Sequence, residues 1–349
     1  MRLFSSVQEV CAQTKNTEGS VFGLLRRADA RTTSTGRPYY DVEIGDTSGS
    51  VGGKIWSERR EAMEAAEALH IGQPVKAGFV VDDYQGTTQL QIDRLRAAGP
   101  SDEGFDPARL FGEVPDWLPD LRCRSLVFDI ETVPATEIRE LPPTIVKSLT
   151  EHADRREMEQ SAVMGLSPYF GKVVTLAFGE GEESIDAQQV TVLAVDHPKR
   201  PSQELPDWVR LVSEAELLHC FWSLASVADV VVSFNGRGFD VPFLVGRSLV
   251  HGIDARVDLL SNRFGLRPHL DLLDVVSQRG RGPANLDVIC WALGIESPKG
   301  EMDGSMVAPA YERGDLGEIA KYNRSDVRAT TQVYQTVRDR VLRFRRDWA

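Results

Sequence analysis

Four acidic residues in three separated clusters carry the chemistry that this sequence can do. Asp129 and Glu131 end an apolar run, Asp240 follows the segment 233–239, and Asp326 lies in a helical segment near the carboxyl end. An ionised carboxylate beside apolar residues is costly unless something neutralises it. If the fold brings the four acids together, bound divalent cations would relieve their mutual repulsion, and oxygen ligands suit magnesium or manganese.

The spacing within each cluster predicts how the side chains point. Because side chains alternate along a strand, Asp129 and Glu131 share one face and Ile130 points into the core. Tyr322 and Asp326 are four residues apart, which places them on one face of a helix. There a phenol can orient a water or help to deprotonate it. An ordinary tyrosine at the core boundary beside an exposed aspartate explains this pair at least as well.

Length and composition limit the class of protein. The 349 residues are enough for two domains. No apolar run reaches the roughly 20 residues that a membrane span needs, and the N-terminus lacks the apolar stretch of a signal peptide. The four cysteines are far apart and form no Cys-x-x-Cys pair. This argues against a zinc ribbon and predicts reduced thiols in a cytoplasmic protein without membrane contact.

The net charge of −12 argues against a simple electrostatic binder of nucleic acid, because phosphate binding relies on Lys and Arg. Residues 1–98 carry 12 basic and 13 acidic side chains, and the remainder carries 28 basic and 39 acidic ones. Nearly all of the excess acid therefore lies in the part with the carboxylate clusters. A cluster that holds metal ions regains positive charge when loaded, so the charge of the bare chain understates its attraction for phosphate.

Residues 1–98 have the pattern of a small β-barrel. Three strands, a helix and two strands are expected over residues 21–25, 39–44, 51–56, 58–69, 74–81 and 87–95, with a hairpin at residues 82–86. This is the order of an OB-fold, a Greek-key barrel that often binds single strands. We therefore predict an all-β OB-fold domain over residues 1–98.

A group of cations and aromatic rings predicts where this domain binds a single strand. The group comprises Arg31, Arg37, Tyr39 and Trp56, which offer positive charge and faces on which bases stack. Alternatively, Tyr39 and Trp56 belong to the barrel core and the arginines are simply solvated. The domain resembles the OB domains attached to certain bacterial 3′–5′ exoribonucleases, in segments 31–39, 45–49, 54–56, 84–86 and 90–93.

The rest of the chain divides into a linker and a second domain. Residues 99–121 contain four prolines among glycines and acids, and we interpret them as a semi-extended linker. Residues 122–349 mix apolar strands with amphipathic helices, which predicts an α/β sheet with helices packed on it. Strands are expected over residues 125–130, 173–178, 190–195 and 230–234, and helices over residues 143–164, 213–226, 241–251, 286–293 and 317–346. The charged stretch 151–160 is either a solvated excursion or a flap on the substrate side.

Together the acidic clusters resemble the three exonuclease motifs of the DEDD superfamily, which implies a ribonuclease H-like α/β fold. The motifs correspond to residues 128–132, 234–242 and 322–326. The tyrosine sub-type, DEDDy, is indicated because Tyr322 precedes Asp326 by four residues. The histidine sub-type would require His where Lys321 stands. The resemblance is to the proofreading domain of family B DNA polymerases and its stand-alone bacterial relatives, over residues 125–337. Residues 269–272 and 299–304 also resemble the stand-alone relatives.

This resemblance implies hydrolysis of phosphodiester bonds with two Mg²⁺ or Mn²⁺ ions as cofactors. It implies that Asp129 bridges both ions and that Asp240 supports the second ion. Glu131 and Asp326 would hold the ion that activates water, and Tyr322 would orient that water.

The second motif also carries residues that resemble neighbours of the terminal nucleotide. Asn235 would contact sugar or base, and Phe239 would be a stacking wedge. The alternatives are a turn-forming asparagine before a glycine and a core phenylalanine. His269 and Asp271 are either groups that support the site or ordinary structural residues.

We therefore expect a metal-dependent 3′–5′ exonuclease that acts on the 3′ ends of single-stranded DNA or RNA, with DNA favoured. The OB-fold would grip the strand and raise the local concentration of substrate. The OB resemblance leaves an exoribonuclease open. A non-catalytic single-strand-binding protein would have lost one of the four acids, and all four are present. The sequence indicates no particular protein partner.

Overall fold

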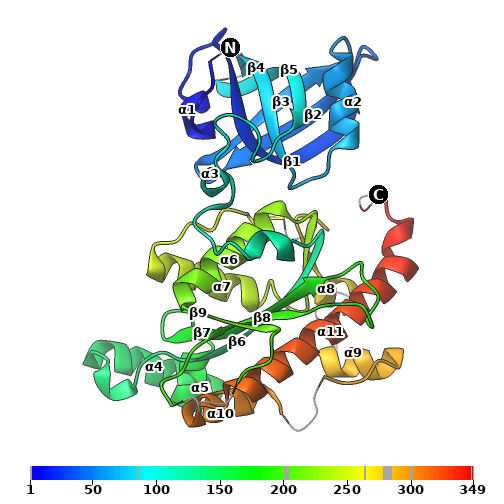
Figure 1. Ribbon diagram of the computed structural model, residues 1–349. Coiled ribbons are helices and arrows are strands. Elements are labelled where there is room, and N and C mark those ends of the chain that lie inside the picture. The colour runs from blue at the N-terminus through cyan, green and yellow to red at the C-terminus, as the bar shows by residue number, and fades with distance from the viewer. Residues whose placement is uncertain are drawn as a thin grey trace. The chain divides into compact units, whose positions relative to one another are not determined.

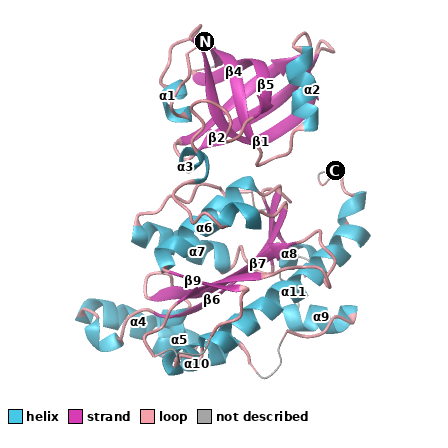
Figure 2. Ribbon diagram, in the orientation of Figure 1, coloured by secondary structure: helices cyan, strands magenta, loops and turns pink. Residues whose placement is uncertain are grey.

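The computed structural model describes residues 2–84, 86–199, 204–262, 265–277, 285–298, 302–346 and 348. The chain forms two compact units (Figure 1). One comprises Met1–Asp120 with Ser226–Asp229, and the other comprises Leu121–Ala225 with Val230–Ala349. Strands make up most of the first unit, and helices surround a sheet in the second (Figure 2). Gln85 of the expected hairpin and residues 299–301 of the expected motif at 299–304 lie outside the described residues.

The first unit is a closed barrel of five strands in the order β1-β2-β3-β5-β4. Antiparallel pairing joins β1 to β2, β2 to β3, β4 to β5 and β4 to β1, and parallel pairing of β3 with β5 completes the ring. The predicted OB-fold, with a helix between the third and fourth strands, is confirmed. Its elements are α1 (Val7–Cys11), β1 (Glu18–Thr32), β2 (Pro38–Asp46), β3 (Gly49–Trp56), α2 (Arg60–Ala68), β4 (Pro74–Tyr84) and β5 (Thr87–Ala97).

Strand alternation builds the core of this barrel. Val42 and Ile44 of β2, Ile55 of β3 and Phe79 of β4 are fully buried in one apolar cluster. Burying each of these side chains stabilises the fold by about 1.5–3 kcal/mol. The residues between them in β2 and β3 point outward, so the outer face of these two strands is available for binding.

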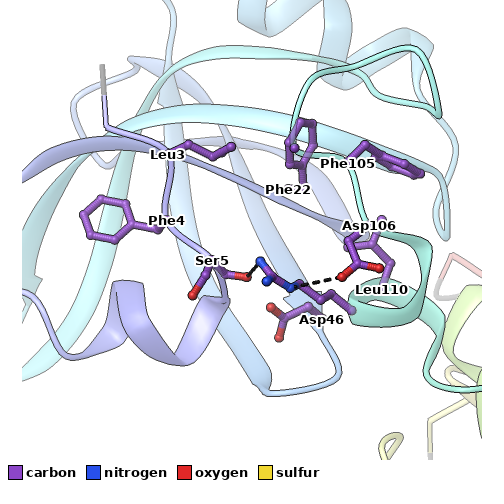
Figure 3. Close-up of a pocket in the computed structure, with 10 residues that line it drawn as sticks. Leu3, Phe4, Ser5, Phe22, Asp46, Phe105, Asp106 and Leu110 are labelled. Atoms are coloured by element: carbon purple, nitrogen blue, oxygen red, sulfur yellow. Dashed lines mark hydrogen bonds and ion pairs between the residues drawn. The ribbon is translucent and has the colours of Figure 1, made fainter.

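The proline-rich segment after the barrel is not extended throughout. It contains the short helix α3 (Pro107–Phe111) and the 3₁₀ helix η1 (Leu118–Leu121). Leu110 is buried in a cluster with Phe22 of β1. Arg109 donates to the backbone oxygen of Ser5 at 3.0 Å and pairs with Asp106 at 3.2 Å (Figure 3). Apolar side chains and these polar contacts therefore hold the segment against the barrel, around a pocket of about 330 Å³.

The second unit is built on a six-stranded sheet in the order β11-β10-β6-β7-β8-β9. β6 (Ser125–Pro134) pairs antiparallel with β7 (Gly171–Glu180), and β7 pairs antiparallel with β8 (Thr191–Val195). β8 pairs parallel with β9 (Val209–Val212). On the other side of β6, β10 (Val230–Ser233) and β11 (His269–Asp271) continue the sheet in parallel.

Helices cover both faces of this sheet, as the α/β prediction requires. They are η2 (Ile138–Glu140), α4 (Pro143–Arg156), α5 (Gln160–Gly165), α6 (Glu214–Val227), α7 (Asp240–His251), α8 (Leu272–Val276), α9 (Leu286–Leu293), η3 (Gly304–Met306), α10 (Val307–Arg313), α11 (Leu316–Arg340) and η4 (Leu342–Phe344). The expected α/β fold is confirmed. Within the described ranges, no helix combines the length and apolar character that crossing a membrane requires.

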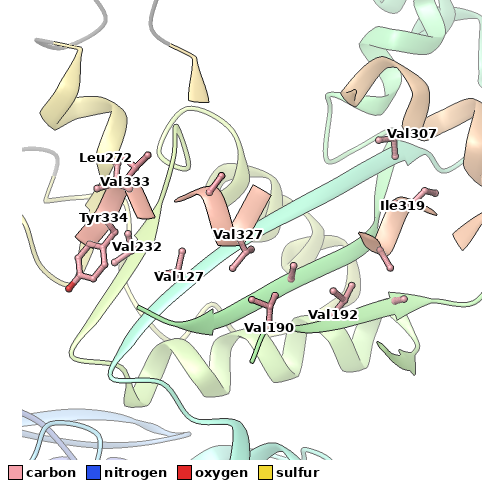
Figure 4. Close-up of a cluster of buried hydrophobic side chains, with 14 of the residues drawn as sticks. Val127, Val190, Val192, Val232, Leu272, Val307, Ile319, Val327, Val333 and Tyr334 are labelled. Atoms are coloured by element: carbon pink, nitrogen blue, oxygen red, sulfur yellow. The ribbon is translucent and has the colours of Figure 1, made fainter. Parts of the chain in front are cut away.

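Successive residues of β6 face different helices. Val127 lies in an apolar cluster with Val327 of α11 (Figure 4). The ring of Phe128 instead lies 4.9 Å from the ring of Phe221 on α6. Because strand side chains alternate, α11 covers the face that carries the odd-numbered residues at the start of β6.

Some elements differ from expectation. The helix expected over residues 143–164 is two helices, because Glu157 adopts a left-handed conformation with φ 53° and ends α4. No Gly or Pro marks this break, so the sequence pattern runs through it. The helix expected to reach residue 346 ends as α-helix at Arg340. β9 and β11 lie outside the predicted strands, because both are short and neither is the continuous apolar run that marks β10, which is also short.

Candidate metal centre and active site

Strand β6 and helix α11 bring three of the predicted acids together. Asp129 and Glu131 lie on the face of β6 that α11 covers, whereas Ile130 is buried on the other face. One carboxylate oxygen from each of Asp129, Glu131 and Asp326 lies within 4.8 Å of the others. Asp326 is buried and the other two are half-buried. Three carboxylates at this separation form a set of oxygen donors that suits a hard divalent cation.

Asp240 adjoins this set from the start of α7. It is buried, and its Oδ1 accepts a hydrogen bond from the backbone N–H of Ile130 at 3.3 Å. This bond links the start of α7 to β6 at the residue between Asp129 and Glu131. A carboxylate in the first turn also interacts favourably with the helix dipole. Asp240 is therefore anchored beside the three clustered acids without belonging to their tightest group.

Burial and mutual repulsion disfavour ionisation of this cluster. Burial, followed by the charges of Asp240, Asp326 and Glu131, raises the pKa of Asp129 well above its ordinary value. Burial and the charges of Asp326 and Asp240 likewise raise the pKa of Glu131. Burial raises the pKa of Asp240 to about 7. A divalent cation bound here would supply positive charge and favour the ionised carboxylates.

Tyr322 stands one helical turn before Asp326 on α11, as its spacing predicted. The phenol is half-buried, and its hydroxyl hydrogen-bonds to Asp326. Burial, with the charges of Asp326, Glu131 and Asp129, raises the pKa of Tyr322 above its ordinary value. The hydroxyl therefore keeps its proton at neutral pH and is a hydrogen-bond donor at the edge of the cluster.

The loop between β10 and α7 is held by a carboxylate from the neighbouring strand. Oδ1 of Asp271 accepts from the backbone N–H of Asn235 at 2.8 Å, and Oδ2 accepts from that of Arg237 at 2.9 Å. Asn235 has φ 65°, a left-handed conformation that asparagine tolerates. The loop is thus a fixed turn that leads into Asp240, and Asp271 supports it.

The two other residues expected near the terminal nucleotide also lie on this loop. Asn235 is exposed, whereas Phe239 is half-buried. The ring of Phe239 lies 5.6 Å from that of Phe243 in α7. Phe239 thus directly precedes Asp240 in the chain and combines packing with an accessible edge.

His269 is a fully enclosed histidine next to this loop. Its Nδ1 donates to the backbone oxygen of Leu259 at 3.0 Å, since a carbonyl can only accept. Nε2 therefore accepts from the hydroxyl of Ser233 at 2.7 Å. Burial lowers the pKa of His269 to about 4. The histidine is neutral and structural, and it ties β11 to β10.

Comparison with known proteins places this geometry in a family. Residues 166–344 match a family described as a predicted 3′–5′ exonuclease related to the exonuclease domain of PolB, and the match spans slightly more than half of the chain. The chain belongs to this family. The expected relationship to the family B polymerase exonuclease domain is confirmed. Asp240, Tyr322 and Asp326 lie inside the match, and Asp129 and Glu131 precede it.

The proteins described next share low sequence identity with this chain. The DNA polymerase of Pyrococcus horikoshii is 24% identical over 183 residues, which cover 47% of this chain and 14% of the polymerase. The family B DNA polymerase from Pyrobaculum calidifontis, whose structure is known, is 15% identical to this chain. The match covers 92% of this chain and 46% of the polymerase, with a TM-score of 0.42. The second OB-fold domain of replication protein A from Methanococcus maripaludis is 16% identical to this chain. The match covers 29% of this chain and 99% of that domain, with a TM-score of 0.22. The chain spans only 10% to 22% of the length of the curated polymerases that it matches.

In this member of the exonuclease family, the barrel residues that were predicted to bind a single strand lie in a row across the outer face of the barrel. Arg31 of β1 is paired with Tyr39 of β2, which is paired with Trp56 of β3. The rings of Tyr39 and Trp56 are 5.3 Å apart, and both are half-buried and outside the core cluster. The guanidinium of Arg37 lies 4.4 Å from the ring of Trp56, and Lys54 lies 5.5 Å from that of Tyr39. The alternative that both aromatics are barrel core is therefore wrong.

Two of the arginines in this row are already partnered. Arg31 pairs with Asp29 at 3.2 Å, and Arg37 pairs with Glu58. Exposed ion pairs of this kind contribute little to stability.

Asn323 is the residue of this site that sequence reasoning missed. It lies inside the third motif, is fully buried, and donates from Nδ2 to Oδ2 of Asp129 at 2.7 Å. Its Oδ1 is enclosed and has no hydrogen-bond partner among the described residues. The available signal was its spacing: Asn323 and Asp326 are three residues apart and share a helix face. A buried polar atom left without a partner calls for an explanation such as a bound water or ion.

Proposed function

We propose that this protein is a metal-dependent exonuclease that removes nucleotides from the 3′ ends of single-stranded nucleic acid, with DNA preferred. The observation that carries the proposal is the convergence of oxygens from Asp129, Glu131 and Asp326 within 4.8 Å. Membership of a family described as a predicted 3′–5′ exonuclease supports the direction of attack. The similarity to DNA polymerases supports DNA as the preferred substrate.

Each residue of the cluster has a part in this proposal. Asp129, Glu131 and Asp326 would hold divalent ions, and Asp240 would complete the set from the start of α7. When bound, two Mg²⁺ or Mn²⁺ ions supply charge stabilisation to the attacking and leaving oxygens of the phosphodiester. Tyr322 would orient the attacking water by hydrogen bonding, since its hydroxyl is fixed by Asp326.

The loop before α7 would place the end of the strand. Asn235 is exposed on the loop that leads into Asp240, and its side chain would hydrogen-bond the terminal sugar or base. The accessible edge of Phe239 would limit how far the terminal base enters. Because Asp271 fixes the backbone of this loop, both side chains are held in place before substrate arrives.

The outer row of the OB-fold would hold the strand upstream of its 3′ end. Tyr39 and Trp56 offer stacking faces, and Arg31, Arg37 and Lys54 offer cations for phosphates. Stacking of a base on an aromatic side chain contributes about 1–3 kcal/mol and tolerates any sequence. This surface would offer cations to phosphates despite the net charge of −12, once a strand displaces the acidic partners of Arg31 and Arg37.

The decisive experiment is degradation of 5′-labelled single-stranded DNA, single-stranded RNA and duplex DNA with Mg²⁺, Mn²⁺ or chelator. We expect a ladder of shortening products on single-stranded DNA that requires the metal. A 3′-phosphorylated strand should resist attack, and a 5′-blocked strand should not. Faster cleavage of RNA would instead identify an exoribonuclease.

Variants assign the activity to the site. Asp129→Ala combined with Glu131→Ala should abolish cleavage and leave binding to single strands unchanged. Glu318→Gln is the matched control, because Glu318 is an exposed carboxylate of α11 that pairs with Lys321. If cleavage survives the double substitution, these carboxylates are not the active site. If the wild-type protein binds single strands and never cleaves them, the protein is a binding module.

A further inference from the structure

We propose that Asn323 is a positioning residue of the metal site: it fixes the orientation of the Asp129 carboxylate and thereby sets the affinity of the site for divalent cations. This inference rests on the metal-dependent function proposed above. It concerns a residue that lies outside the pattern of acids and to which the sequence alone assigned no role.

The geometry joins the two elements that form the site. Asn323 is carried by α11, and Asp129 is carried by β6. The bond of 2.7 Å between Nδ2 of Asn323 and Oδ2 of Asp129 crosses from helix to strand. The orientation of the amide follows from chemistry, because a carboxylate oxygen only accepts and so faces the nitrogen. One oxygen of Asp129 is thus held, and the other is left for a cation.

An amide suits this task better than a charged donor. Lysine or arginine at this position would neutralise Asp129 and compete with the cation for it. The amide of Asn323 is neutral, so it orients the carboxylate and leaves its negative charge in place. Partners that orient metal-binding groups in this way typically change metal affinity or activity by about 10–100-fold when removed.

The other end of the amide points to the same conclusion. Asn323 is fully buried, and its Oδ1 has no hydrogen-bond partner among the described residues. Leaving a buried acceptor unpaired is unfavourable. Because the same amide is bonded to Asp129, a water on a cation bound at Asp129 is the partner that the proposal assigns to this oxygen.

The test measures Mn²⁺ binding to the full-length protein by calorimetry, without nucleic acid. Asn323→Leu keeps the number and branching of the side-chain heavy atoms and removes both polar atoms, and we expect the Kd for Mn²⁺ to rise about 10–100-fold. Thr331→Val is the matched control. Thr331 is fully buried on the same helix, donates to the backbone oxygen of Val327 at 2.8 Å and accepts from Gln188 at 2.8 Å. Its loss should change the Kd less than twofold.

A second measurement uses the unsubstituted protein, so it does not depend on whether the variant folds. The side-chain amide signal of Asn323 in the nitrogen–proton NMR spectrum should shift with Mg²⁺ along the calorimetric binding curve. The inference is wrong if a folded Asn323→Leu protein binds Mn²⁺ with wild-type affinity. It is also wrong if Mg²⁺ binds the unsubstituted protein and the amide signal does not shift. Either result leaves the proposed function intact. A wild-type protein that binds no divalent ion overturns the proposed function.

Discussion

A carboxylate oxygen of Glu131 on β6 and one of Asp326 on α11 lie within 4.8 Å of each other. Two acids held this close repel each other strongly, and burial raises the pKa of Glu131 further. The protein keeps this arrangement at the expense of the stability of its metal-free form. Four consequences can be measured.

The first prediction concerns removal of one acid from the cluster. Glu131→Gln should abolish cleavage, because a neutral amide is a poor ligand for Mg²⁺. In chelator the same variant should be more stable than the wild type by about 1 kcal/mol, which is about 3 °C in Tm for a domain of this size. Differential scanning calorimetry with and without Mg²⁺ measures both forms. An unchanged or lower Tm in chelator would show that the acids do not repel each other in solution.

The second prediction separates Tyr322 from the metal ligands. Tyr322→Phe removes the hydroxyl that bonds to Asp326 and keeps the ring. We expect kcat to fall about 10–100-fold, as loss of one hydrogen bond to a charged group worth about 1.5–3 kcal/mol implies. Mn²⁺ affinity in calorimetry should stay within a factor of three, because the ring provides no ligand. A large loss of Mn²⁺ affinity would make Tyr322 part of the metal site itself.

The third prediction concerns the support of the loop before Asp240. Asp271→Ala leaves the backbone N–H groups of Asn235 and Arg237 without their acceptor. We expect unfolding free energy to fall by about 2–4 kcal/mol and KM for single-stranded DNA to rise. The control is Asp274→Asn, which removes only a 3.5 Å contact to Arg237 and should cost less than about 1 kcal/mol. If urea denaturation shows the same loss of unfolding free energy for both variants, Asp271 does not support the loop more than Asp274 does.

The fourth prediction concerns pH. Burial lowers the pKa of His269 to about 4, below the value of about 6.5 of an unfolded chain. The unfolded state therefore binds a proton between these values that the folded state does not, so the stability that neutral His269 contributes is lost as pH is lowered from about 6.5 to 4. The loss due to His269 should be about 3 kcal/mol. The raised pKa values of Asp129, Glu131 and Asp240 act in the opposite direction. His269→Gln should therefore reduce the loss of stability between pH 6.5 and pH 4.5 in urea denaturation. A variant with the wild-type pH dependence would show that another group causes it.

The sequence by itself determined the classes of the two domains and the identity of the acids. Strand alternation placed Asp129 and Glu131 on one face, and helical periodicity placed Tyr322 beside Asp326, because both patterns depend on backbone geometry alone. The order of strands around one helix was sufficient to predict the OB barrel. Patterns of this kind involve only residues close together in the sequence, so they can be recognised without the tertiary structure.

Only the tertiary structure decided which groups meet across elements. The bond from Asn323 to Asp129 and the two bonds from Asp271 to the loop join segments far apart in sequence, and no local pattern encodes them. The same holds for Tyr39 and Trp56, whose outward orientation depends on the register between β2 and β3. A shift of one residue in that register would turn the ring of the shifted strand into the core and separate the pair. Long-range pairing fixes these contacts, and it is set by the packing of the whole domain.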